Sequence, residues 1–220
     1  MTEEPGPPDP TPDGESLDAV ELRVLGSLIE KQAATPDVYP LTEAALVAAC
    51  NQKTSRDPIM ELEPGAVGQT LRALERRELT RRVHGARTHR WEQRLDRVLD
   101  IPRPQLVLLA LLFLRGPQTL NELLTRSARM HRFDDPEQIA HHLQRLQTRG
   151  LVVQIPRRAG QREDRYMHTL AGPVDTSGPA PEPVPREGRA GGGSGLLARL
   201  QELEARVAAL EAKLSPDGDS

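Results

Sequence analysis

The chain has 220 residues, a formal net charge of −3 and a single cysteine, Cys50, which excludes an intrachain disulfide. The longest apolar run, 106–114, is much shorter than the about 20 residues that span a membrane. The acidic N-terminus has no apolar stretch of the kind that signal peptides contain. We therefore expect a soluble, cytoplasmic protein without a membrane partner.

The two ends of the chain differ in composition from its middle. Residues 1–16 are mostly Pro, Gly, Asp and Glu, and 171–195 are again rich in Pro and Gly. Such segments have too little apolar surface to offset the entropy of ordering, so we predict a disordered acidic tail, a flexible linker and a disordered end at 215–220. Residues 17–170 hold 24 Lys and Arg against 19 Asp and Glu, so the foldable part is mildly basic. That charge is compatible with nucleic-acid binding.

Three helices are predicted in the first half of the foldable region. Asp18 and Glu21 have the spacing of a capping box, which marks the start of the first helix. Thr42 is a suitable N-cap for a second helix that extends to about Cys50. Pro64 stands where a third helix begins, since proline is favoured in the first turn.

The third helix and the residues after it recur at an offset of 72 residues. Spacings of four and three place the apolar positions on one helix face. Each copy continues into two short strand-like runs joined by a turn, 79–83 with 88–92 and 151–155 with 165–170. The matching positions are Pro64, Val67, Leu71, Leu74, Arg77 and Leu79 in the first copy and Pro136, Ile139, Leu143, Leu146, Arg149 and Leu151 in the second.

The second half also supplies two helices before its copy of the repeat. Residues 103–115 form a strongly apolar helix, which we expect at the buried centre of the fold. Thr119 and Glu122 have capping-box spacing, and Asp135 and Gly150 are expected to begin and end the last helix. Each half therefore has the order helix, helix, helix, hairpin within about 75 residues, which is typical of a winged helix-turn-helix.

The predicted fold class is mainly α with small β-hairpins (α+β). We predict two tandem winged helix-turn-helix domains, 17–97 and 98–170, and a C-terminal short coiled-coil helix at 196–214. The last segment spans fewer than three heptads and is marginal alone, so it either joins copies of the chain into a homo-oligomer, docks on its own domain or frays. Its seam consists of Leu196, Leu200, Leu203, Val207, Leu210 and Leu214.

Six runs of residues are long and unusual enough to identify relatives: RVLG (23–26), TPDxYPL (35–41, with any residue at 38), ACNQK (49–53), RDP (56–58), LRGPQT (114–119) and RYMH (165–168). In these runs the chain resembles the YceH family of bacterial proteins, whose function is undefined, and the resemblance covers about 18–172. It implies two winged-helix domains, often with a C-terminal Leu/Ala/Glu-rich helix, and it supplies no catalytic residue. Ala159 departs from the family, which usually has Pro before the glycine of the second hairpin.

Arginines gather on the predicted hairpins, where winged helices contact the DNA backbone while the third helix enters the major groove. An arginine can donate two hydrogen bonds to one phosphate. We therefore predict a sequence-tolerant protein that binds double-stranded DNA; the alternative for the same side chains is a solvated surface. The candidate contacts are Gln69, Arg72, Arg76, Arg81, Arg82, Arg87, Arg90, His141, Arg145, Arg157 and Arg158.

A polar loop after the second helix gives a different hypothesis. Five of its side chains place many donors in one short stretch, as a site for a protein partner or a phosphate would: Asn51, Gln52, Lys53, Ser55 and Arg56. The chain would then be a protein-interaction scaffold that uses tandem winged helices without binding DNA. Local helix capping and turn formation also explain these residue types.

The sequence does not favour an enzyme. Cys50 has apolar neighbours and no histidine close in sequence, so we expect an inert buried thiol. His141 and His142 are adjacent, and adjacent helical side chains point about 100° apart, which suits one metal ion poorly. The glycines at 191–195 follow no strand and do not form a phosphate loop. We expect no catalytic residue, no metal site and no cofactor.

Overall fold

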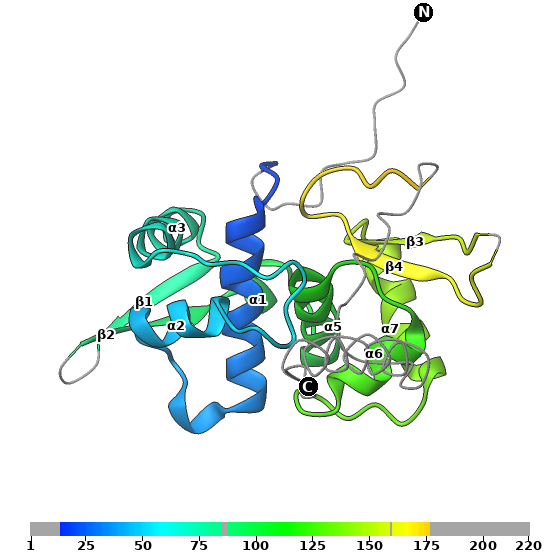
Figure 1. Cartoon of the computed structure of the whole chain (residues 1–220), viewed down its shortest axis with the longest axis horizontal. Coiled ribbons are helices and arrows are strands. Elements are labelled where there is room, and N and C mark those ends of the chain that lie inside the picture. Colours follow the sequence, from blue (N-terminus) through cyan, green and yellow to red (C-terminus); the bar gives the residue numbers. More distant parts are fainter. Residues whose placement is uncertain (1–13, 85–87, 159, 177–220) are drawn as a thin grey trace, which may run out of the picture. The chain divides into compact units, whose positions relative to one another are not determined.

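The structure, a computed structural model, describes residues 14–84, 88–158 and 160–176. Within these ranges the chain is an α+β protein with seven α-helices and two small antiparallel sheets of two strands each (Figure 1). The predicted N-terminal tail up to residue 13, most of the linker and the heptad segment 196–214 lie outside the described residues. The predictions for those segments therefore stay predictions.

The first half begins with the predicted capping box. The Asp18 carboxylate accepts hydrogen bonds from the backbone N–H groups of Val20 and Glu21, and the Glu21 carboxylate accepts from the backbone N–H of Asp18. Thr42 caps the second helix as predicted, and Pro64 lies in the first turn of the third. The elements are α1 (Ala19–Ala34), the 3-10 helix η1 (Pro36–Val38), α2 (Glu43–Cys50), α3 (Pro64–Arg76), β1 (Thr80–His84), β2 (His89–Gln93) and α4 (Leu95–Val98).

The second half repeats this order. The capping box of Thr119 and Glu122 is confirmed, and Asp135 accepts from the Gln138 backbone N–H at the start of the last helix. Gly150 follows that helix with a φ of +71°, the left-handed conformation predicted for it. The elements are α5 (Arg103–Arg115), α6 (Leu120–Ser127), α7 (Pro136–Thr148), β3 (Val152–Ile155) and β4 (Arg165–His168).

Each hairpin has one additional bridge that the sequence did not predict. Leu41, just before α2, pairs with Trp91 of β2, and Gln118, just before α6, pairs with Tyr166 of β4. In both cases the two residues exchange backbone hydrogen bonds, at 2.7 and 3.1 Å in the first half and 2.8 and 3.1 Å in the second. The segment before the second helix is therefore attached to the outer edge of the hairpin in both halves.

The apolar positions of the sequence repeat have equivalent surroundings in the two halves. Val67, Leu71 and Leu74 of α3 are fully buried, and so are their counterparts on α7, Ile139, Leu143 and Leu146. Each helix is followed by a buried leucine and a hairpin. The predicted internal repeat is therefore present in three dimensions.

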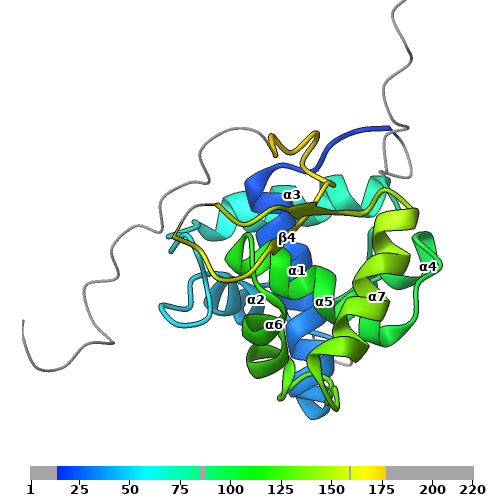
Figure 2. The same ribbon diagram turned by 90° about the vertical axis from the view of Figure 1, so that its right-hand side faces the viewer.

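The centre of the core is formed by α1 and α5, which lie side by side in both ribbon views (Figures 1 and 2). Every residue of α5 from Gln105 to Leu114 is buried, as predicted for this helix. Gly26 lies at the contact: a Cβ atom added there would be 2.9 Å from Cγ of Leu114 and 3.2 Å from Cβ of Phe113. A side chain at this position would separate the two helices, so glycine sets their close approach.

Substituting Gly26 with valine should therefore destabilise the protein. We expect a loss of about 1–3 kcal/mol in the free energy of unfolding, because a branched side chain overpacks the α1–α5 contact. Gly65→Ala is the matched control, since no atom lies within 4 Å of a Cβ at Gly65 and alanine favours a helix by up to about 1 kcal/mol. Urea denaturation measures both changes. Equal stability of Gly26→Val and the wild type would contradict this packing.

His168 should make stability depend on pH. Its side chain is buried against Phe113, with the two ring centroids 4.9 Å apart, and its Nδ1 has no partner among the described residues. Burial lowers the pKa of His168 to about 4. The unfolded chain, in which a histidine has a pKa of about 6.5, then takes up the proton first, so stability falls as pH drops from 6.5 towards 4.

The free energy of unfolding should fall by about 3 kcal/mol between pH 6.5 and pH 4, and this fall should be absent above pH 7. Urea denaturation at pH 7.5 and at pH 4.5 compares the wild type with His168→Phe, which should lose most of the difference. The exposed His141, changed to Gln, serves as the control and should retain it. An unchanged pH dependence in His168→Phe would contradict the expectation.

Candidate nucleic-acid interface

The solvent face of α3 presents three of the predicted contact residues. Gln69, Arg72 and Arg76 are spaced by three and four residues, lie opposite the buried stripe of the helix and are all exposed. Among the described residues, neither guanidinium has a hydrogen-bond or ion-pair partner. Two cations and one amide are therefore free to meet an anionic ligand along one helix face.

Strand β1 adds a further cation close to the end of α3. The Thr80 hydroxyl donates to the carbonyl of Leu71, and the backbone N–H of Arg82 donates to the Glu75 carboxylate at 3.2 Å. Since residues two apart in a strand share a face, Arg82 lies on the same face of β1 as Thr80, next to α3. Its side chain is exposed and has no partner within the described ranges, so it extends the cationic surface of α3.

The other arginines of the first hairpin are engaged within the protein. Arg81 forms an ion pair with Glu92 at 2.8 Å, and its side chain stays half-exposed. Arg90 donates to the carbonyl of Pro40 at 2.8 Å and more weakly to that of Val38. An exposed ion pair such as that of Arg81 and Glu92 contributes little to stability, so Arg81 can exchange Glu92 for a phosphate. Arg87 lies outside the described residues.

The third helix of the second half has a different set of polar residues. His141 and Arg145 lie one turn apart on the exposed face of α7, and Arg145 has no partner in the described part of the chain. At the offset of 72 residues, however, Arg72 and Arg76 are replaced by Gln144 and Thr148. The face of α7 is therefore less cationic than that of α3.

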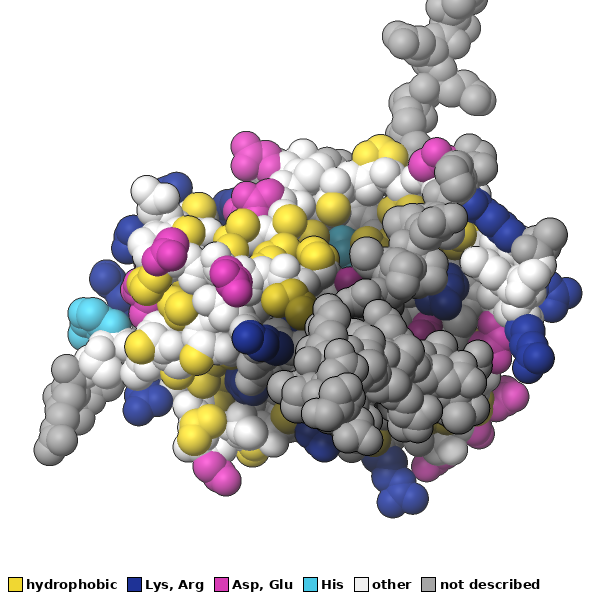
Figure 3. Space-filling view, in the orientation of Figure 1, with side chains coloured by type: hydrophobic (Ala, Val, Ile, Leu, Met, Phe, Trp, Pro, Cys, Tyr) yellow, Lys and Arg dark blue, Asp and Glu magenta, His cyan; other side chains and the backbone are white. Residues whose placement is uncertain are grey.

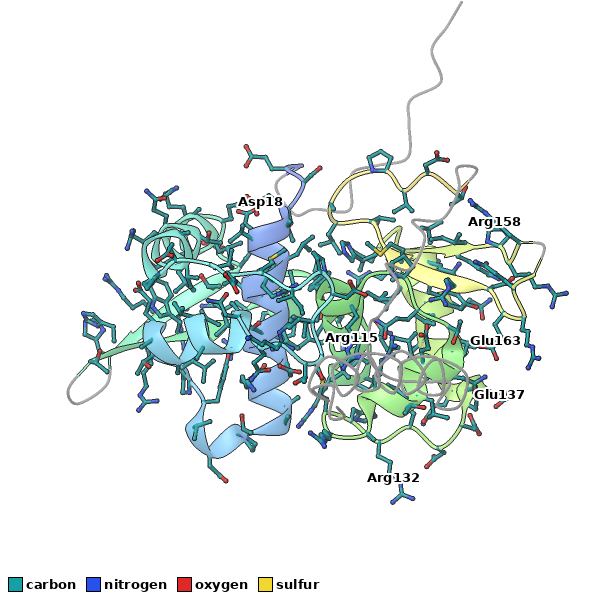
Figure 4. All side chains as sticks on the ribbon, viewed as in Figure 1. Asp18, Arg115, Arg132, Glu137, Arg158 and Glu163 are labelled. Atoms are coloured by element: carbon teal, nitrogen blue, oxygen red, sulfur yellow. The ribbon has the colours of Figure 1, made fainter. Side chains whose placement is uncertain are left out.

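The second hairpin mixes charges of both signs. The backbone N–H of Arg157 donates to the Asp164 carboxylate at 2.9 Å, and this hydrogen bond is the main cause that lowers the pKa of Asp164. Glu163 accepts from Asn121 at 2.6 Å, and it lies at the same end of the molecule as Arg158 (Figure 4). In the space-filling view, Lys and Arg side chains lie at both ends of the face and along its lower edge, and carboxylates are interspersed among them (Figure 3).

The predicted partner-binding loop is held mainly by its own polar side chains. The Asn51 side-chain amide donates to the carbonyl of Leu62 at 2.9 Å and accepts from its N–H at 2.8 Å, which ties the two ends of the loop together. Lys53 is exposed, whereas Gln52 and Ser55 are half-buried. Ser55 has a φ of +64°, so its position is one of local chain reversal.

Arg56 is the most buried residue of this loop. Its side chain is 0% exposed and forms an ion pair with Glu30 of α1, while its Nε donates to the carbonyl of Ala49 at 3.1 Å. A cation without solvent contact needs such partners, because burial of an unpaired charge is costly. Arg56 therefore fastens the loop to α1 and is not presented to a ligand.

A second buried arginine, Arg23, was not among the predicted residues. It is 1% exposed and donates to the carbonyls of Cys50 and Pro58, from the end of α2 and from the loop. Burial lowers the pKa of Arg23, and the nearby Arg56 cation lowers it further. The only sequence signal was an arginine inside the apolar run 22–29. Arg23 and Arg56 together fix the path of residues 51–58.

Cys50 is adjacent to these arginines but has no feature of a nucleophile. Its side chain is buried, and burial raises the pKa of the thiol, so the thiolate is disfavoured near neutral pH. Across the described residues, no three His, Cys, Asp or Glu side chains are grouped closely enough to hold a metal ion. No helix in the same ranges has the length and hydropathy needed to cross a bilayer.

Comparison with known proteins assigns the family. A family model described as "Protein of unknown function, DUF480" matches residues 17–161. A "UPF0502 protein" of Pseudomonas fluorescens is 58% identical over 200 residues, covering 90% of this chain and 92% of its own. Another, from Pseudomonas syringae pv. tomato, is 54% identical over 211 residues and 95% of each chain. The chain therefore belongs to this uncharacterised bacterial family, which agrees with its resemblance to the YceH family.

Proposed function

We propose that each half is a winged helix-turn-helix and that the protein binds double-stranded DNA without acting as an enzyme. The order of helix, helix, helix and hairpin supports the assignment, and so does the bridge that attaches the segment before the second helix to each hairpin. In that architecture α3 and α7 are the helices that enter the major groove, and the hairpins follow the phosphate backbone.

The unpaired guanidinium groups around α3 are the observation on which the proposal depends. The side chains of Arg72, Arg76 and Arg82 are exposed, their guanidinium groups have no carboxylate partner among the described residues, and they come from one helix face and the adjoining strand. Such groups can donate paired hydrogen bonds to phosphates and release counterions from DNA. Gln69, on the same helix face, is the side chain placed to meet a base edge.

The second half contributes mainly backbone contacts in this proposal. Its unpaired cation on the helix is Arg145, and Arg157 and Arg158 belong to the turn of its hairpin. Carboxylates at Glu163 and Asp164 reduce the net charge there. With few groups suited to base contacts, we expect affinity that depends strongly on salt and weakly on DNA sequence.

Replacing arginines of α3 and β1 should weaken duplex binding and reduce its dependence on salt. We expect Arg72→Ala to lower the affinity for a random duplex by about tenfold, because a charge-assisted contact is lost. The triple variant Arg72→Ala/Arg76→Ala/Arg82→Ala should reduce the slope of log affinity against log salt by about 3, since each lost phosphate contact removes about 0.9. Fluorescence anisotropy between 50 and roughly 300 mM salt measures both quantities.

Arg132→Ala is the matched control for charge, because this exposed side chain points away from the second hairpin (Figure 4). It should bind duplex as the wild type does, apart from a small non-specific change. Absence of duplex binding by the wild type at low salt would exclude the proposal. Equal losses in Arg72→Ala and Arg132→Ala would show that net charge, not the α3 surface, is responsible.

One observation favours a second function, a protein-interaction scaffold. Ile59 is 58% exposed in the loop between α2 and α3, and Met60 and Leu62 beside it are only partly buried. Apolar side chains also gather in the middle of the face shown in Figure 3. An exposed apolar patch is typical of a partner-binding surface.

Changing Ile59 to Lys distinguishes this second function from the first. If the loop binds a protein, immobilised wild-type chain should retain a specific partner that the variant loses, while duplex binding stays unchanged. Ala44→Lys on the exposed face of α2 is a control for the added charge. Identical retention by wild type and Ile59→Lys would exclude a partner on this loop.

A further inference from the structure

The first half contains a carboxylate held between an arginine and a helix N-terminus. Arg77, which directly follows α3, has its Nη1 at 3.3 Å from both carboxylate oxygens of Glu21, the third residue of α1. The same carboxylate accepts from the backbone N–H of Asp18 in the capping box. Arg77 also donates to the carbonyl of Glu15 at 2.6 Å. An anion at this place thus joins the end of the third helix to the start of the first.

The second half reproduces this arrangement without the anion. Arg149 directly follows α7, as Arg77 follows α3, and it donates to the carbonyl of Leu99, which corresponds to that of Glu15. Arg149 makes its other hydrogen bond, at 2.9 Å, to the carbonyl of Asp100. The third residue of α5, however, is Gln105 where α1 has Glu21. Among the described residues, no carboxylate occupies the position between the Arg149 guanidinium and α5.

Gln105 is left without the contacts that Glu21 makes. It is 3% exposed, yet its side-chain amide has no hydrogen-bond partner among the described residues. The N-cap of α5 is Pro102, which supplies no side-chain hydrogen bond to the first turn, whereas Asp18 caps α1. The Gln105 amide is therefore left to solvent or to a ligand beside it, and the positive end of the α5 dipole favours a negative charge there. Both features point to a ligand from outside the chain.

A pocket of about 320 Å³ is open at this place, with room for a hydrated oxyanion. Besides Arg149, this pocket contains a second cation, Arg145, at the position where the first half has Ala73. Two guanidinium groups therefore face the one carboxylate of Asp100, which leaves the pocket net positive. The lining residues are Asp100, Pro102, Gln105, Arg145, Thr148 and Arg149.

We propose that this pocket binds a phosphate group, which takes the place of the Glu21 carboxylate of the first half. The guanidinium groups of Arg145 and Arg149 donate to its oxygens, the Gln105 amide supplies a further N–H, and the N-terminus of α5 favours its negative charge. The phosphate belongs either to a nucleic-acid backbone or to a small phosphorylated compound. The site does not require that the chain bind DNA.

The decisive variant is Gln105→Glu, which supplies the internal carboxylate that the first half already has. The full chain is titrated with inorganic phosphate at constant ionic strength, with chloride as the reference, and binding is followed by calorimetry and by the amide NMR signals of α5. We expect saturable phosphate binding by the wild type and a loss of at least about tenfold in affinity for Gln105→Glu. The variant should unfold at a higher temperature, as expected when Arg149 gains a carboxylate partner.

Two further variants complete the test. Arg145→Ala should also weaken phosphate binding, whereas Arg132→Ala, which removes an exposed arginine outside both this pocket and the α3 surface, should leave it unchanged. The proposal is overturned if the wild type shows no saturable binding, or if Gln105→Glu binds phosphate as tightly as the wild type. Equal weakening in Arg145→Ala and Arg132→Ala would also overturn it, because the effect would then be one of net charge.

The source of the phosphate is identified by adding a short duplex to the same titrations. If the backbone of DNA is the ligand, duplex should compete with phosphate, and Gln105→Glu should bind duplex more weakly. If inorganic phosphate binds and duplex does not compete, the pocket serves a small phosphorylated compound. That result would support the site while leaving the test of DNA binding to the α3 variants, so the two proposals can fail separately.

Discussion

The contact between α1 and α5 is the constraint on which the rest of the structure depends. These are the corresponding first helices of the two halves, and both are buried along most of their length. Because Gly26 has no side chain, Leu114 and Phe113 pack directly against the α1 backbone. The apolar surface of each half is thereby used against the other half, and the hairpins extend towards opposite ends of the molecule in Figure 1. The polar surfaces available for ligands are those of α3, α7, the hairpins and the loop after α2.

The two halves share a backbone plan but use different polar chemistry. In the first half, Arg23, Arg56 and Glu30 form a buried set of contacts that fixes the loop after α2. In the second half, the residues that correspond to Arg23 and Glu30 are Val107 and Leu114, which are apolar and buried. A buried charge is stable only beside its partners. The charged residues and their partners are therefore present together in the first half and replaced together in the second. The exposed surfaces differ as well: among the described residues, the third helix of the first half carries two unpaired arginines, Arg72 and Arg76, and that of the second half carries one, Arg145.

The features that the sequence predicted correctly are local ones. Capping boxes, the proline at a helix start and the glycine after α7 act within four residues, and the repeat allowed each half to confirm the other. The single-residue bridges at Leu41 and Gln118 have no pattern of their own, because pairing partners lie about fifty residues away. Arg56 looked available for a partner since polar loops usually face solvent, and its burial depends on Glu30, which is distant in sequence. Predicting the pocket beside Gln105 would have required knowing that the start of α5 lies next to the end of α7.

The two candidate anion surfaces differ in how strongly the structure argues for a ligand. Exposed arginines such as Arg72 are well solvated, so their lack of a partner has almost no energetic cost, and it indicates only that the surface is available. The Gln105 side chain is only 3% exposed, and its amide reaches solvent in the pocket that it lines. A phosphate there would meet two guanidinium groups and this amide in one confined place, whereas a phosphate at Arg72 would meet an open surface. The pocket at the start of α5 is therefore the place where the structure argues more strongly for a bound anion.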